Sequence, residues 1–129
     1  MVECVGGGGA VVMMRPAADM VVYVCVAPVD FRLQINGLAS CVQEVLGLAP
    51  LSAHLFAFTN RHRNRVKVLY WERNGFVLWQ KRLERDRFHW PRGDDLTVSL
   101  TGQELNWLLD GFDLRHWRPH GRLDYQWVA

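Results

Sequence analysis

Hydrophobic and polar positions along the chain fall into short runs that predict strands and helices. The run from Val21 to Val26 is β-branched and aromatic, which predicts a buried strand that ends before Pro28. A helix should follow, capped by Asp30 and ended by Gly47 and Pro50. Its apolar face is the set of residues at helical spacing: Ile35, Leu38, Val42, Val45 and Leu46.

The clearest local signal is a β-hairpin. Asn74-Gly75 lies between the β-rich runs Val66 to Trp71 and Phe76 to Trp79. Asn-Gly in this position favours a two-residue type I′ turn with positive φ at both residues. Apolar residues on both faces of the two strands favour a central place in the sheet. We expect further short strands at His54 to Phe58, Arg87 to Trp90 and Thr97 to Leu100.

A second helix is predicted after the last of these strands. Thr101-Gly102-Gln103-Glu104 matches the T-x-x-E capping box. The helix face behind it is formed by Leu105, Leu108, Leu109 and Phe112, and Gly111 should end the helix. The predicted fold is α+β: a small antiparallel β-sheet with a central β-hairpin at Asn74-Gly75, flanked by two short α-helices.

The domain organisation follows from the ends of the chain. Residues 1–18 are predicted to be a flexible N-terminal tail, because Gly6 to Gly9 are four consecutive glycines. Residues 19–114 form a single α+β domain, and residues 115–129, which include Pro119 and Gly121, an irregular C-terminal tail. No apolar run is long enough to span a membrane, and residues 1–18 do not resemble a secretory signal. Three widely spaced cysteines predict no disulfide framework, so we expect a cytoplasmic protein.

Charge is distributed unevenly along the 129 residues. The net charge is only +2, yet the stretch from Arg61 to Arg92 holds ten Lys or Arg residues and three acids. Arg61, Arg63, Arg65 and Lys67 alternate, so a strand would place them on one face. If the sheet is antiparallel, the far end of the hairpin returns beside them, and the predicted nucleic-acid-binding set is Arg61, Arg63, Arg65, Lys67, Arg73, Lys81, Arg82, Arg85 and Arg87.

Two other interpretations of this basic stretch remain open. Trp71 and Trp79 flank the turn and could stack on bases, or they could contact a partner protein. The charges could equally form a solvated rim above a tryptophan-rich core. The predicted partner-binding set is Arg32, Trp71, Trp79, Arg82 and Glu84.

Nothing in the sequence predicts catalysis, a metal or another cofactor. His116 and His120 are separated by Pro119, which breaks the helix that would align them, and no cysteine pair has ligand spacing. Cys41 fits a core position on the first helix. The acids Asp94 and Asp95 fit a solvated turn, and no serine lies in a glycine-rich elbow.

Three stretches resemble a known family: PVDFRLQINGLA (Pro28 to Ala39), NRHRNRVKVLYWERNGFVLWQKRLERDRF (Asn60 to Phe88) and LTGQELNWLLDGFD (Leu100 to Asp113). They are similar to the small accessory protein, of the TnpB type, encoded by bacterial insertion sequences of family sixty-six. The residues that match its motifs are Asp30, Arg32, Gly37, Leu38, Lys67, Trp71, Gly75, Lys81, Arg82, Leu83, Glu84 and Phe88. Leu33 stands where the family usually has a basic residue, which weakens the case that the start of the first helix binds phosphate.

The resemblance implies a protein needed for efficient transposition, encoded beside a separate DDE-type transposase and not itself the catalyst. We therefore expect a non-catalytic accessory protein that binds DNA, such as transposon ends, through its basic surface. The alternative is an adaptor that docks on the cognate transposase or on other accessory proteins of the element, with Arg82 and Glu84 among its contacts. Neither hypothesis involves a membrane or a cofactor.

Overall fold

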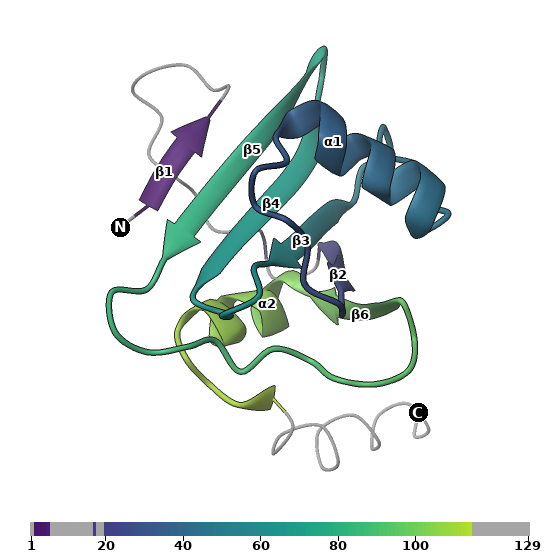
Figure 1. Cartoon of the computed structure of the whole chain (residues 1–129). Helices are drawn as coiled ribbons and strands as arrows, with labels where there is room; N and C mark the ends of the chain where they lie inside the picture. Colours follow the sequence, from purple (N-terminus) through teal and green to yellow (C-terminus); the bar gives the residue numbers. More distant parts are fainter. Residues whose placement is uncertain (1, 6–16, 18–19, 115–129) are drawn as a thin grey trace.

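The computed structural model describes residues 2–5, 17 and 20–114 (Figure 1). The elements follow in the order β1 (Val2–Val5), β2 (Val21–Cys25), α1 (Ile35–Ser40), the π-helical η1 (Cys41–Val45), β3 (Leu55–Thr59), β4 (Arg65–Glu72), β5 (Gly75–Arg82), β6 (Thr97–Thr101) and α2 (Gly102–Leu109). The two helical segments α1 and η1 follow each other directly. The α+β class predicted from the sequence is confirmed.

The strands form one sheet in the order β1-β5-β4-β3-β2-β6. Strands β3, β4 and β5 are a continuous antiparallel meander. Strand β2 pairs with β3 in parallel, because the helical segment between them carries the chain back to the end of the sheet from which β2 started. The prediction of a purely antiparallel sheet was therefore wrong, and the sheet is mixed.

Both faces of the sheet are covered (Figure 1). On one face, Leu38 and Val42 of α1 and η1 pack against Phe56, Phe58 and neighbouring core residues. On the other face, α2 and the loop after β5 bury a second cluster, which includes Val22, Ala57, Val68, Trp79, Phe88, Trp90, Leu105 and Leu108. Because alternate residues of a strand point to opposite faces, a strand between two such layers needs apolar residues at successive positions. All five residues of β3 are buried.

Helix α1 begins later than the capping prediction required. Its N-cap is Gln34, whose side chain makes no capping hydrogen bond, so Asp30 does not cap it. The Asp30 carboxylate instead accepts a hydrogen bond from the backbone N–H of Arg32 at 2.9 Å, and Leu33 N donates to Asp30 O at 3.0 Å. Asp30 thus stabilises a turn ahead of the helix, as Asx side chains commonly do.

The hairpin is present, but its turn lies one residue earlier than predicted. Glu72 pairs with Gly75, so Arg73 and Asn74 are the connecting residues. Arg73 has φ of 55°, whereas neither Asn74 nor Gly75 has a positive φ. The observed register places Leu69 opposite Leu78; with Asn74-Gly75 in the turn, Leu69 would face Gln80. Pairing of buried apolar residues therefore outweighs the preference of Asn-Gly for the turn.

No strand forms at Arg87 to Trp90, and that prediction was wrong. Residues 83–96 contain no helix or strand. The alternation that suggested a strand has another cause: Phe88 and Trp90 are buried under the sheet, while Arg87 and His89 are exposed. The indole Nε1 of Trp90 donates to Cys25 O at 2.9 Å, which fixes this loop to the end of β2.

Helix α2 begins as the sequence predicts and ends earlier than predicted, at Leu109. Thr101 Oγ1 accepts from Glu104 N at 3.1 Å, and Glu104 Oε1 accepts from Thr101 N at 2.9 Å, which completes the capping box. Gly111, with φ of 101°, follows the C-cap. Gly111 N donates to Leu108 O and Phe112 N to Trp107 O, the two hydrogen bonds of a Schellman motif. Phe112 lies beyond the helix and is exposed, so it does not extend the apolar face as predicted.

The predicted tails are only partly within the described residues. Val2–Val5 forms the edge strand β1, antiparallel to β5, in a segment where the sequence predicted no element. The four residues Val-Glu-Cys-Val are short but β-prone, and β5 offers them an open edge. Residues 6–16 and 115–129 lie outside the description, so the boundaries at residues 19 and 114 stay predictions.

Candidate nucleic-acid interface

Two basic loops meet at one end of the sheet. Leu83 N donates to Asn64 O at 2.8 Å, and Phe88 N donates to Arg63 O at 2.7 Å. These bonds join the turn before β4 to the loop after β5, as expected if the two ends of the meander are neighbours. We call this surface the cationic end of the sheet and define it by six residues: Arg61, Arg63, Arg65, Arg82, Arg85 and Arg87.

The turn before β4 is held by the side chain of Asn60. Asn60 Oδ1 accepts from Asn64 N and Arg65 N, both at 3.1 Å, and Asn60 Nδ2 donates to Asn64 Oδ1 at 2.7 Å. Arg63, with φ of 56°, adopts the left-handed conformation inside this turn. Arg61 and Arg63 therefore lie in a turn, and the prediction that one strand presents Arg61, Arg63, Arg65 and Lys67 on a single face was wrong. Local side-chain hydrogen bonds have displaced the strand at these positions.

Three arginines of the cationic end are exposed and, within the described residues, have no acidic partner: Arg61, Arg85 and Arg87. Arg63 is half-buried, and its Nε is a buried donor for which residues 20–114 supply no acceptor. Arg65 stands directly opposite Arg82 on the neighbouring strand. Like charges in that arrangement repel, and the carboxylate of Glu84, which pairs with Arg82, offsets part of this repulsion.

Lys67 and Lys81, both predicted to contact phosphate, have side chains that make contacts within the fold. Lys67 is only 2% exposed, and its Nζ donates to Phe31 O at 3.1 Å and Leu33 O at 2.8 Å. The same ammonium lies 4.8 Å from the centre of the Phe31 ring. Burial, reinforced by the nearby charge of Arg65, lowers the pKa of Lys67. Lys81 Nζ donates to Leu109 O at 3.0 Å, a favourable place for a cation at the C-terminus of α2.

Other predicted contacts lie away from the cationic end. Arg73 is in the hairpin turn at the opposite end of the eight-residue β4, roughly 25 Å along the strand. Arg32, whose side chain is 91% exposed, forms an ion pair with Asp30 at 2.7 Å and lowers the pKa of that carboxyl to about 2. Arg82, by contrast, belongs to the cationic end; it pairs with Glu84 at 3.2 Å, and both side chains are exposed.

The two tryptophans next to the hairpin turn do not form one surface. Trp79 is 2% exposed and belongs to the core on the α2 side, so it cannot stack on bases as proposed from the sequence. Trp71 is half-buried and packs edge-to-face on Phe76, with ring centres 5.1 Å apart. Trp71 and Arg82 lie at opposite ends of the hairpin, so the predicted partner-binding residues are not brought together.

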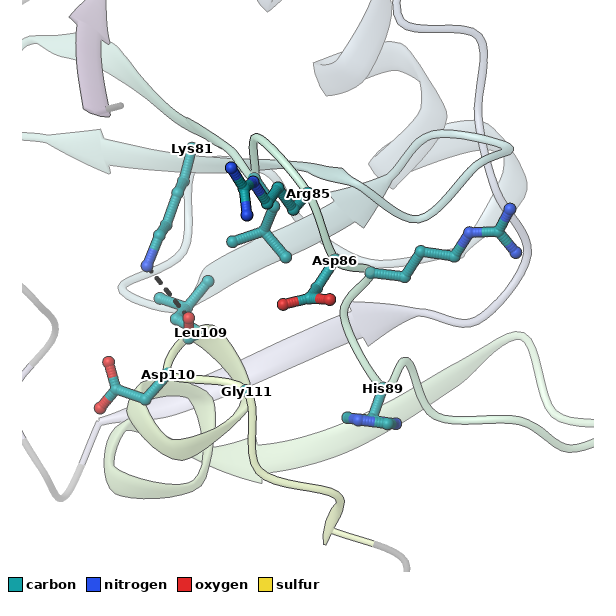
Figure 2. Close-up of a pocket in the computed structure, with 9 residues that line it drawn as sticks. Lys81, Arg85, Asp86, His89, Leu109, Asp110 and Gly111 are labelled. Carbon is teal, nitrogen blue, oxygen red and sulfur yellow. Dashed lines mark hydrogen bonds between the residues drawn. The ribbon is translucent and has the colours of Figure 1, made fainter.

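A groove between the loop after β5 and the end of α2 adjoins the cationic end (Figure 2). Its volume is about 680 Å³, and it combines basic, acidic and apolar side chains: Lys81, Leu83, Arg85, Asp86, Arg87, His89, Leu109 and Asp110, with Gly111 at its edge. Sequence reasoning found Lys81, Arg85 and Arg87 from the charge pattern alone. It missed His89, Asp86 and the α2 residues, because no spacing rule relates a loop to a helix end some twenty residues later.

The described residues offer no obvious site for metal or nucleophilic chemistry. No group of three His, Cys, Asp or Glu side chains is arranged to hold a metal ion in this part of the chain. Burial raises the pKa of the Cys25 thiol to about 11 and also raises that of Cys41, which makes both poor nucleophiles. No helix within the described ranges is long and apolar enough to cross a membrane.

The fold and its cationic end define a small α+β protein with six arginines gathered at one end of its sheet. The model of the IS66 Orf2-like protein family matches residues 20–119, and the chain belongs to that family. This confirms the resemblance seen in the sequence and associates the chain with insertion-sequence transposition in an accessory role.

Two curated relatives come from Sinorhizobium fredii (strain NBRC 101917 / NGR234), and both are named only as uncharacterized proteins. The protein y4hO is 36% identical over 111 residues, which is 83% of this chain and 96% of the relative. The protein y4jC is 31% identical over 101 residues, which is 78% of this chain and 86% of the relative. No solved structure shows significant similarity to the chain.

Proposed function

We propose that this protein is a non-catalytic accessory factor of insertion-sequence transposition that binds DNA through the cationic end of the sheet. This proposal rests on a group of exposed arginines that have no acidic partner among residues 20–114: Arg61, Arg85 and Arg87. They lie beside the half-buried Arg63 and Arg65. Arginine is well suited to such contacts, because its guanidinium stays charged and its fork of donors matches phosphate oxygens. A DNA-binding role of this kind places the protein in the bacterial cytoplasm.

The geometry of the two loops supports this function. Asn60 and the backbone bonds from Leu83 and Phe88 hold the arginine-bearing segments in place before any ligand arrives. A preorganised surface loses less conformational entropy on binding than a mobile one. Contacts of this type position DNA without reading its sequence, so we expect similar affinity for different duplexes.

The test compares two double variants that each remove two positive charges. Arg61→Ala/Arg85→Ala removes one arginine from each loop of the cationic end, whereas Arg32→Ala/Arg73→Ala removes two from elsewhere. Each lost phosphate contact should reduce the slope of log affinity against log salt by about one unit. We expect a decrease of about two units for the first variant and much less for the second, measured by fluorescence anisotropy with transposon-end and random duplexes. Equal effects of the two variants, or no duplex binding at low salt, would refute DNA binding by this surface.

The adaptor function has one observation in its favour. The exposed pair Arg82–Glu84 lies on the cationic end and offers both charges to a partner at one spot. If the protein is an adaptor for the transposase, DNA affinity should be weak in the unmodified chain. Capture of the cognate transposase should then be lost in Arg82→Ala or Glu84→Ala and retained in Arg73→Ala.

A further inference from the structure

Asp86 is an acidic residue in a place where a purely phosphate-binding surface should have none. It lies between Arg85 and Arg87 in the sequence, yet it forms no ion pair with either within the described structure. Figure 2 shows its carboxylate directed into the groove, toward the end of α2 and between Arg85 and His89. A carboxylate that faces DNA repels phosphate, but it can accept hydrogen bonds from the N–H groups of a base.

The groove has the composition of a site for one nucleotide. Leu83 supplies apolar surface, and His89 and Arg85 supply flat side chains on which a base can stack. Its volume of about 680 Å³ is within the range of pockets that take small ligands. Arg87 also lines the groove and belongs to the cationic end, so it can contact a phosphate that lies outside the groove and is attached to such a base.

The base with the best chemical match to Asp86 is an unpaired guanine. The Watson–Crick edge of guanine carries two adjacent N–H donors, which can point to the two oxygens of one carboxylate. In a duplex this edge is occupied by cytosine, and the major-groove edge of guanine presents only acceptors, which a carboxylate repels. Thymine has one N–H between two carbonyls and fits a carboxylate poorly.

We infer that the groove between the loop after β5 and the C-terminal end of α2 binds an unpaired guanine nucleotide of a DNA strand, with Asp86 accepting from the base. This inference rests on the proposed function, because the cationic end would hold the duplex that leads to the unpaired nucleotide. The ligand of the whole surface is then DNA with a single-stranded extension or a frayed end, rather than an intact duplex.

The experiment uses the full chain and three labelled ligands: a blunt duplex, the same duplex with an oligo-dT overhang, and one whose overhang carries a single guanine. The wild-type protein should bind the guanine overhang about 5- to 150-fold more tightly than the oligo-dT overhang, the discrimination expected of a good bidentate base contact. Asp86→Ala should abolish that preference while the affinity for blunt duplex rises or stays the same. Asp86 is exposed and makes no hydrogen bond within the described residues, so this variant should fold normally.

The matched control is Asp94→Ala, which removes the same charge from an exposed position of the same loop. It should leave the preference for guanine intact. Equal binding of the two overhangs by the wild type would overturn the inference. The inference would also be overturned if Asp86→Ala and Asp94→Ala changed the affinity for all three ligands by the same factor.

These failures are distinguishable from failure of the proposed function. Salt-dependent binding of blunt duplex without a guanine preference would leave the cationic end as the DNA-binding surface and refute only the groove. Binding of the guanine overhang without duplex binding would keep the groove and refute the surface. Loss of transposase capture in Asp86→Ala, with no guanine preference, would assign the groove to the partner protein and overturn the inference.

Discussion

At the scale of single residues, Lys67 shows why a basic residue in a motif need not be a binding residue. Its position in β4 places it on the face covered by α1, under the turn that contains Phe31 and Leu33. There the ammonium replaces water with two carbonyl oxygens and the ring of Phe31. The family motif residue Lys67 therefore joins the segment before α1 to the central meander.

We expect Lys67→Met to lower the free energy of unfolding by about 1–3 kcal/mol, because the carbonyls of Phe31 and Leu33 lose their donor. Methionine keeps much of the length and apolar stem of the side chain. The measurement is urea denaturation. Arg61→Met, at an exposed position, should change stability by less than about 0.5 kcal/mol. A Lys67→Met protein as stable as the wild type would contradict this role.

The same pair of proteins gives a pH test. The pKa of Lys67 is lowered in the folded protein from its usual value of 10.5, so the unfolded chain holds this proton more tightly. Raising the pH through the window between the lowered pKa and 10.5 therefore favours folding. The stability advantage of the wild type over Lys67→Met should grow as pH rises through that window, and a constant or shrinking difference would be inconsistent with a buried ammonium.

At the scale of elements, the sequence predicted what depends on local chemistry. The strands in the meander, the first helix and the capping box of α2 follow from periodicity and from side chains a few residues apart. The predictions were wrong where contacts between residues far apart in the sequence determine the structure. The hairpin turn moved because Leu69 pairs with Leu78, and the parallel pairing of β2 with β3 depends on how the intervening helix packs. The alternation at Phe88 and Trp90 reflects burial of a loop, which looks like a strand in sequence.

The capping box gives a prediction at this scale. Thr101→Ala should lower the free energy of unfolding by about 1 kcal/mol, because Glu104 N loses its acceptor at the start of α2. Thr101→Ser keeps the hydroxyl and should stay within a few tenths of a kcal/mol of the wild type. Thermal or urea unfolding of both variants is the measurement, and an equal loss in the two would mean that the cap is not the cause.

At the scale of the whole molecule, the basic stretch predicted a cationic surface but not its composition. The charge pattern and the return of the meander brought Arg61, Arg63 and Arg65 together with the loop after β5. The charge pattern could not distinguish the exposed arginines from Lys67 and Lys81. The ammonium groups of these two lysines donate to the backbone carbonyls of Phe31 and Leu109, which are far away in the sequence. The groove that includes Asp86 depends on the docking of α2 and was not predictable from one segment.

We expect the purified protein neither to cut nor to join DNA, with Mg²⁺, with Mn²⁺ or without either. Its described residues hold no acid cluster suited to a metal ion, and Asp94 and Asp95 are exposed in the loop before β6. The measurement is incubation with supercoiled plasmid and with transposon-end duplexes, followed by gel electrophoresis. Reproducible cleavage that disappears in Asp94→Ala or Asp95→Ala would contradict this prediction.

The order of strands in the sheet also constrains how the chain can fold. Strands β3, β4 and β5 are consecutive, so they can pair as soon as residue 82 has left the ribosome. Strand β2 pairs on one side with β3, which lies some thirty residues later in the sequence. On its other side it pairs with β6, which begins only at Thr97. In a nascent chain, β2 is therefore an unprotected edge strand until β6 is synthesised. Because closing long loops is slow, the pairing of β2 with β6 should be among the last steps of folding. Val21, Val22 and Val24 are the apolar residues exposed to mispairing during that interval.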